Sequence, residues 1–139
     1  MASEKKCILV VDDDPDLRRG LVLLLGKEYD IHEACDGPSC LRALAESCPH
    51  LLLLDVAMPG MTGIEVLRSA RAGCICIPVL MLTAQADLEM AREALELGAN
   101  AYITKPFDFG ELRREVKRLL EGPSPRQKDD EYRPWRVTP

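Results

Sequence analysis

The chain lacks a long apolar run and lacks an excess of positive charge. Its 139 residues include 23 acidic and 18 basic side chains, which give a net charge of −5. No stretch approaches the roughly 20 apolar residues that a membrane-spanning helix needs. A surface that binds nucleic acid is normally basic. We therefore expect a protein that neither spans a membrane nor binds nucleic acid directly.

The six cysteines form no C-x-x-C pair, and His32 and His50 are the only histidines. An even number of cysteines can form disulfides in a secreted protein. However, the residues before the first apolar run, 1–6, show no signal-peptide pattern. We therefore expect a cytoplasmic protein with reduced thiols, most of them small core hydrophobes. A redox role for Cys74 and Cys76 is the alternative interpretation.

Short apolar runs alternate with segments of helical periodicity five times along the chain. The runs predict strands at 7–11, 30–35, 51–54, 78–82 and 101–104. Several of them are apolar throughout, which is typical of parallel strands covered on both faces. The alternation predicts an α/β fold with a doubly wound, five-stranded parallel sheet in the order 2-1-3-4-5.

The composition changes near Gly122. Residues 123–139 are rich in proline and charge and show no periodicity. We predict one domain over 5–121 and a flexible tail or linker over 122–139. A short binding segment around Trp135 is the alternative interpretation of the tail.

Polar residues stand where the predicted strands end. Asp12 and Asp13 follow the first strand, Asp55 the third, Thr83 the fourth and Lys105 the fifth. In a parallel sheet these ends share one edge, where ligands bind. Clustered carboxylates repel unless a cation neutralises them, and Mg²⁺ prefers such oxygen ligands. The pattern therefore indicates a magnesium site beside a carboxylate, Asp55, that can attack phosphorus.

Three motifs carry a resemblance to a known family. They are ILVVDDDP at 8–15, DVAMPGMTG at 55–63 and KPF at 105–107. With these motifs the chain resembles a response-regulator receiver domain of the CheY-like superfamily, over residues 5–121. The resemblance implies a flavodoxin-like (βα)5 fold and a place in two-component signalling.

The resemblance also implies roles for single residues and for partners. A sensor histidine kinase or a phosphotransfer protein would donate the phosphoryl group, with Mg²⁺ (or Mn²⁺) as cofactor. The chain would be a phosphoacceptor and not a turnover enzyme. It would act on a downstream protein, on an output domain, or through a phosphorylation-dependent homodimer. The implied residues are Asp55 as phosphoacceptor, Asp12, Asp13, Asp55 and the Ala57 carbonyl at the metal, Thr83 and Lys105 at the phosphoryl group, and Thr83 with Tyr102 as the switch.

Three other interpretations stay open from the sequence. A haloacid-dehalogenase-like phosphohydrolase also uses aspartate, Mg²⁺, threonine and lysine, but its nucleophile follows the first strand. A receiver-like module that binds its partner without phosphorylation is the second. A flavodoxin-like electron carrier shares the topology, but it needs a hydroxyl- and glycine-rich loop where this chain has acids.

Overall fold

The computed structural model describes residues 5–73 and 75–121, so the predicted tail over 122–139 and Cys74 lie outside the described residues. Strands and helices alternate along the chain. The strands are β1 (Cys7–Val11), β2 (Asp30–Ala34), β3 (Leu51–Asp55), β4 (Val79–Ala84) and β5 (Ala101–Lys105). The helices are α1 (Pro15–Leu25), α2 (Gly37–Ser47), α3 (Gly63–Ala72), the 3-10 turn η1 (Gln85–Asp87), α4 (Leu88–Glu96) and α5 (Phe109–Glu121).

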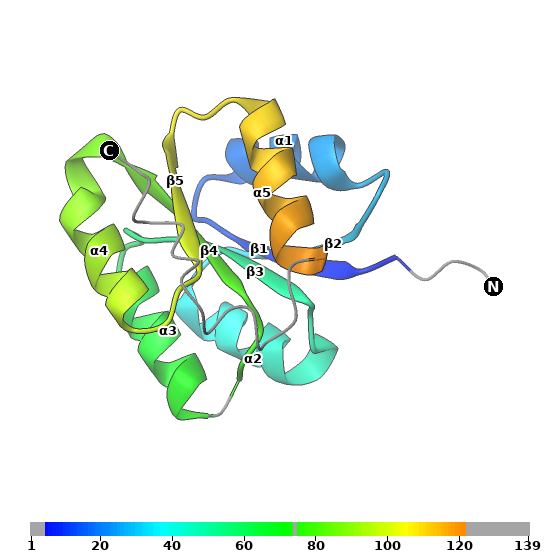
Figure 1. Ribbon diagram of the computed structural model, residues 1–139. Coiled ribbons are helices and arrows are strands. Elements are labelled where there is room, and N and C mark those ends of the chain that lie inside the picture. The colour runs from blue at the N-terminus through cyan, green and yellow to red at the C-terminus, as the bar shows by residue number, and fades with distance from the viewer. Residues whose placement is uncertain (1–4, 74, 122–139) are drawn as a thin grey trace.

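The sheet has the predicted order, β2-β1-β3-β4-β5, and every neighbouring pair is parallel. Figure 1 shows α1 and α5 on one side of it and α2, α3 and α4 on the other. Alternate residues of a strand point to opposite faces. Ile8 and Val10 accordingly pack with α1 and α5, whereas Leu9 and Val11 pack with the other three helices. The sheet is thus buried on both faces, which explains its apolar strands.

Helix starts cluster at the carboxyl edge of the sheet. An oxygen acceptor just before a helix satisfies its first free N–H groups. Asp14 accepts from the N–H groups of Asp16 and Leu17, as the Asp14-Pro15 sequence predicts, and Thr62 caps α3. An aspartate immediately precedes α1, α2, α4 and α5, namely Asp14, Asp36, Asp87 and Asp108.

Four of the five predicted strands differ from the structure at one or both limits. The third ends at Asp55 and not at 54, and the fifth ends at Lys105 and not at 104. The second strand ends at Ala34, and not at 35 as predicted. The fourth begins at Val79, after Pro78, and continues to Ala84 beyond the predicted end at 82. It continues because Thr83 and Ala84 still pair with β5. Thr83 therefore lies inside the sheet rather than in the loop after it.

The prediction that most cysteines are core residues is wrong. Cys40 is buried and Cys7 is partly buried, but Cys35, Cys48 and Cys76 are exposed. Cys40 and Leu44 lie on the buried face of α2. Cys48 follows the last residue of this helix and has a left-handed conformation, with φ of 46°. Cys7, Cys35, Cys40 and Cys48 are free thiols.

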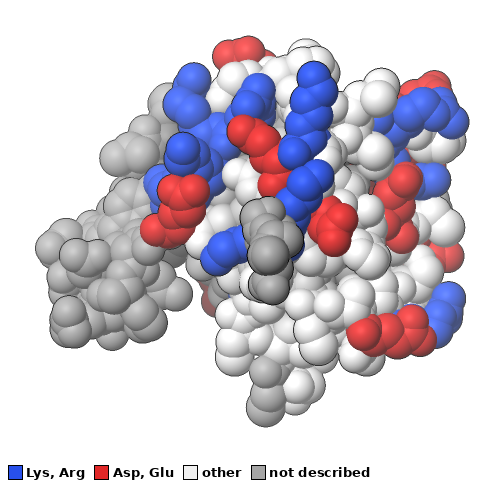
Figure 2. Space-filling view, turned by 90° about the vertical axis from the view of Figure 1, so that its right-hand side faces the viewer, with Lys and Arg blue, Asp and Glu red and all other residues white. Residues whose placement is uncertain are grey.

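Lysines gather at the opposite edge, where the strands begin. Lys5, Lys6 and Lys27 line a shallow hollow beside Tyr29 and Leu120. Figure 2, which faces this side, shows Lys and Arg side chains among Asp and Glu. Lys5 Nζ donates to the carbonyl of Gly26, just past α1, at 3.3 Å. A cation is favourable at a helix C-terminus, so Lys5 complements the end of α1.

No helix in the described part of the chain is long and apolar enough to cross a bilayer.

Candidate functional site

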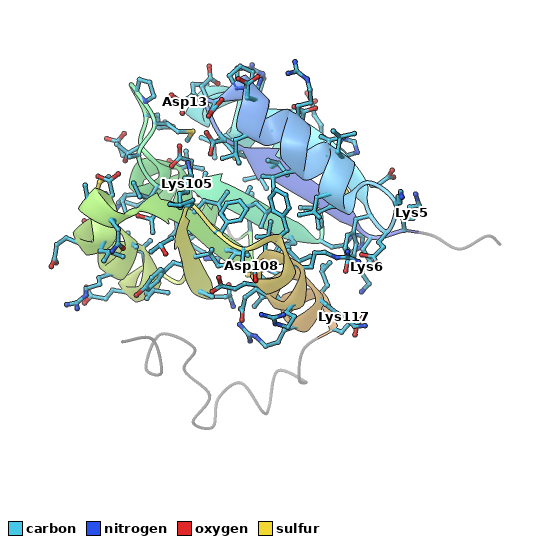
Figure 3. The ribbon with its side chains drawn as sticks, turned by 90° about the horizontal axis from the view of Figure 1, so that it is seen from above. Lys5, Lys6, Asp13, Lys105, Asp108 and Lys117 are labelled. Atoms are coloured by element: carbon cyan, nitrogen blue, oxygen red, sulfur yellow. The ribbon has the colours of Figure 1, made fainter. Side chains whose placement is uncertain are left out.

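The structure brings the three predicted acids together. Asp12 and Asp55 are buried and Asp13 is exposed, and one carboxylate oxygen of each lies within 4.8 Å of the others. Figure 3 shows Asp13 and Lys105 at one end of the domain, with Lys5 and Lys6 at the other. The convergence follows from the parallel sheet, because β1 and β3 are neighbours and end at the same level.

Asp12 accepts three hydrogen bonds, and its N–H donates a fourth to the Ala34 carbonyl at 3.2 Å. Its Oδ1 accepts from the Asp14 N–H at 3.0 Å, and its Oδ2 accepts from Lys105 Nζ at 2.9 Å. Its main-chain carbonyl accepts from Arg18 Nη1 at 2.6 Å. A fully buried carboxylate needs such partners, since burying an unpaired charge is costly.

The surroundings of Asp55 disfavour its ionised form. Its Oδ2 lies 3.6 Å from Lys105 Nζ, and its Oδ1 accepts from the Ala57 N–H at 3.2 Å. Burial first, and then the charge of Asp12, raise the pKa of Asp55 to about 6, against the lowering effect of Lys105. An additional positive charge here would stabilise the ionised form.

Lys105 reaches inward from the end of β5. Its peptide bond to Pro106 is cis. Burial disfavours its charge, but the hydrogen bond that Lys105 donates to Asp12 and the charges of Asp12 and Asp55 outweigh this, so the pKa of Lys105 is raised. Lys105 is therefore a fixed ammonium group between two carboxylates.

Thr83 lies on the same edge but turns away from the acids. It is fully buried, and its hydroxyl stands 3.1 Å from the Ala84 carbonyl oxygen and 3.2 Å from that of Asp87. Tyr102 pairs with Met81 across β4 and β5 and packs, partly buried, against the same core as Met81. Because Met81 and Thr83 are two residues apart on one strand, Thr83 and Tyr102 share a face of the sheet.

The acidic cluster has the donors that a hard divalent cation takes. Three carboxylates offer oxygen ligands, and one oxygen of each lies within 4.8 Å of the others. Magnesium commonly uses few carboxylates and keeps several waters. The exposed Asp13 leaves the cluster open to solvent, so the residues present fit such an ion.

Sequence reasoning missed Arg18 as a neighbour of this site. Arg18 bonds both the Asp12 carbonyl and the Glu33 carboxylate of β2. Its signal was weak, because an arginine on a polar helix face usually lies in solvent. Its place in the first turns of α1, directly after the acidic residues, is the only hint in the sequence.

Comparison with known proteins places the chain in context. The profile of the response regulator receiver domain matches residues 8–117. Sporulation initiation phosphotransferase F of Bacillus subtilis (strain 168) is 40% identical over 121 residues, which cover 86% of this chain and 96% of that protein. The DNA-binding response regulator MtrA of Mycobacterium tuberculosis (strain H37Rv) is 42% identical over 132 residues, covering 94% of this chain and 55% of that protein.

Solved structures agree with these sequence matches. The chemotaxis protein CheY4 of Vibrio cholerae superposes with a TM-score of 0.78 at 29% identity, covering 84% of this chain and 100% of that one. A CheY-like receiver domain protein of Methanospirillum hungatei JF-1 superposes with a TM-score of 0.80 at 30% identity, covering 85% of this chain and 95% of that one. The chain spans only 25% of the regulatory protein AtoC of Escherichia coli (strain K12) and about half of the MtrA proteins, at 53% to 55%.

Proposed function

Because this chain belongs to the response regulator receiver domain family of two-component signalling, we propose that Asp55 is its phosphoacceptor. The donor is a phosphohistidine of a sensor histidine kinase or of a phosphotransfer protein. An Asp55 carboxylate oxygen forms the new bond to phosphorus while the P–N bond to histidine breaks, and the histidine nitrogen leaves with the electron pair. The chain is then a phosphoacceptor that assists its own modification and does not turn over a substrate.

The observation that carries this proposal is the surroundings of Asp55. The carboxylate is buried at a strand end with Lys105 Nζ 3.6 Å away and two further acids beside it. Phosphoryl transfer depends mainly on positioning and on fixed positive charge at the phosphoryl oxygens. Lys105 supplies one such charge, and the Ala57 N–H, which donates to Asp55 Oδ1 at 3.2 Å, is a donor for a second oxygen.

We place the divalent cation on Asp12, Asp13, Asp55 and the main-chain carbonyl of Ala57. The observed Ala57 contact is its N–H to Asp55, so the carbonyl is assigned by resemblance alone. Mg²⁺, or Mn²⁺ in its place, supplies positive charge to the phosphoryl group when bound. Asp13→Ala removes the exposed ligand and should abolish binding of either ion.

The output follows from Thr83 and Tyr102. On phosphorylation, the Thr83 hydroxyl leaves the carbonyls of Ala84 and Asp87 and donates to a charged phosphoryl oxygen. The Tyr102 ring then fills the space that the Thr83 side chain vacates. A ligand shifts a two-state equilibrium only through contacts that differ between the states. The face over 87–97, 101–104 and 109–120 changes as a result. That change acts on a downstream protein, an output domain or a second copy of the chain, in the cytoplasm and without direct contact to nucleic acid.

The test is intact mass after incubation with acetyl phosphate and Mg²⁺. The wild type should gain one phosphoryl group, Asp55→Asn should gain none, and chelation of Mg²⁺ should abolish the gain. Asp108→Asn is the matched control, because Asp108 lies on the same edge and donates no ligand to the cluster. An Asp55→Asn protein that gains the phosphoryl group at the wild-type rate refutes the assignment.

A second measurement addresses output. Size-exclusion chromatography and pull-down, with and without beryllofluoride as phosphoryl mimic, should show tighter binding to a partner protein or to a second copy. Sequence-specific DNA binding by residues 1–139 alone, at physiological salt, would contradict the proposal.

A further inference from the structure

Arg18 lies behind the acidic cluster and not in it. Its Nη1 donates to the Asp12 carbonyl at 2.6 Å, and its Nε lies 3.1 Å from Glu33 Oε1. Its side chain is only 17% exposed, whereas that of Glu33 is 45% exposed. The guanidinium, carried by α1, thus connects the carboxyl ends of β1 and β2.

The hydrogen bond from Arg18 to the Asp12 carbonyl affects where the Asp13 carboxylate points. Within residues 5–73 and 75–121, the Asp13 side chain makes no hydrogen bond or ion pair, so the main-chain turn around it sets where its carboxylate lies. Asp12 and Asp14 bound this turn, and the Asp14 N–H closes it onto Asp12 Oδ1 at 3.0 Å. Arg18 holds the same turn from the main-chain side, through the Asp12 carbonyl.

We infer that Arg18, braced by Glu33, is a positioning residue for the divalent-cation site: it fixes the Asp12–Asp14 turn so that the Asp13 carboxylate faces Asp55. The inference rests on the proposed function, because it concerns how well the acids are arranged for the ion. Partners outside a metal's own ligands commonly change its affinity 10- to 100-fold, roughly.

Removing the charge of Arg18 distinguishes a positioning role from a purely electrostatic one, by whether cation affinity falls or rises. A guanidinium near the site repels a cation, so removing it should tighten cation binding if charge were its only effect. If Arg18 positions the turn, removing it should weaken binding instead. The two effects predict opposite changes.

Arg19 offers a matched control on the next residue. It carries the same charge on the same helix, but its side chain is 70% exposed and pairs with Asp16 at 3.2 Å. Among the described residues its side chain makes no hydrogen bond or ion pair with the Asp12–Asp14 turn. Arg19→Met therefore removes a charge without touching the turn.

The experiment measures Mn²⁺ binding to the full chain by electron paramagnetic resonance, in the wild type, Arg18→Met, Arg18→Lys, Glu33→Gln and Arg19→Met. Arg18→Met should weaken binding about tenfold, and Arg19→Met should change it less than about twofold. Arg18→Lys should be intermediate, because one ammonium cannot reproduce the planar two-sided contact. Glu33→Gln should weaken binding slightly, since a neutral acceptor keeps the hydrogen bond.

Hydrogen exchange of the Asp14 amide in metal-free protein is the second measurement. It should be faster in Arg18→Met than in Arg19→Met, because the turn is less restrained. Equal or tighter Mn²⁺ binding by Arg18→Met, with wild-type exchange at Asp14, overturns the inference. If Arg18→Met does not fold, Arg18→Lys decides by the same two measurements. A wild type that fails to bind Mn²⁺ refutes the proposed cation site itself, which is a separate result.

Discussion

Gly63 lies directly against the main chain of Asp55. A Cβ on Gly63 would overlap the Asp55 carbonyl oxygen and would come within 2.8 Å of Val56 Cα. The Gly63 N–H donates to the Val56 carbonyl at 2.9 Å, so the start of α3 is joined to the end of β3. The main chain that carries Asp55 is thus held in place by a residue that must lack a side chain.

Gly63→Ala should lower the free energy of unfolding by about 2 kcal/mol, because the main chain of Asp55 and Val56 cannot move away from the added methyl. It should also slow phosphorylation by acetyl phosphate by displacing Asp55. Gly20→Ala is the control: the added Cβ meets nothing within 4 Å in α1. That variant should gain about 0.5–1 kcal/mol from helix propensity. Urea unfolding measures both, and equal effects would refute the argument.

Asp55→Asn should stabilise the metal-free protein at neutral pH. The pKa of Asp55 is raised to about 6 in the folded protein. Its protonated carboxyl therefore contributes fully to folding stability below the unfolded-state pKa, and this contribution is lost as the pH rises through 6. The asparagine variant carries no such ionisation. Its advantage over wild type should therefore grow from near zero at pH 4 to about 1–3 kcal/mol at pH 7.5.

Urea unfolding in EDTA at both pH values measures this difference. Asp36→Ala is the opposing control, because the Ser39 hydrogen bonds lower the pKa of Asp36. That group stabilises the fold above its unfolded pKa and loses this as pH falls, so its removal should cost most at neutral pH. A pH-independent gain in Asp55→Asn would show that ionisation is not the cause.

Thiol reagents should separate the cysteines by burial. Burial raises the pKa of Cys40 to about 12, so its reactive thiolate is scarce and also inaccessible. Cys35, Cys48 and Cys76 are exposed and should react in native buffer. Iodoacetamide labelling with peptide mass mapping measures this, with urea-unfolded protein as the control. Cys40 labelling as fast in native buffer as in urea would contradict the described core.

Thr83→Ala should accept the phosphoryl group yet lose the conformational response. The methyl of alanine cannot bond the phosphoryl oxygen, whereas Thr83→Ser keeps the hydroxyl and should keep the response. Amide chemical shifts of residues 101–104, with and without beryllofluoride, measure it. Equal shift changes in wild type and Thr83→Ala would remove Thr83 from the switch.

The fold could be predicted because its signals are local and repeated. Continuous apolar runs identify buried parallel strands, and Asp14-Pro15 identifies a helix start. The polar residues at the strand ends could be placed on one edge because parallel strands leave no other arrangement. The convergence of Asp12, Asp13 and Asp55 followed from strand order alone.

Other features depend on contacts that a single sequence does not reveal. The Thr83 hydroxyl turns to the carbonyls of Ala84 and Asp87 because β4 runs farther than its apolar run suggests. The exposure of Cys48 depends on where α2 ends, because Cys48 follows the last helical residue and has a left-handed conformation. Arg18 reaches Asp12 and Glu33 only because β1 and β2 lie side by side.

The aspartates that begin α1, α2, α4 and α5 share an edge with the three acids of the cluster, while Lys5, Lys6 and Lys27 occupy the opposite edge. Asp55 therefore lies at an edge of the domain where acidic side chains gather. Acetyl phosphate, a small anion, meets repulsion there before it meets Lys105. Its encounter rate should rise with ionic strength, the reverse of the salt effect on oppositely charged partners. A protein donor escapes this penalty if it brings positive side chains to the same edge.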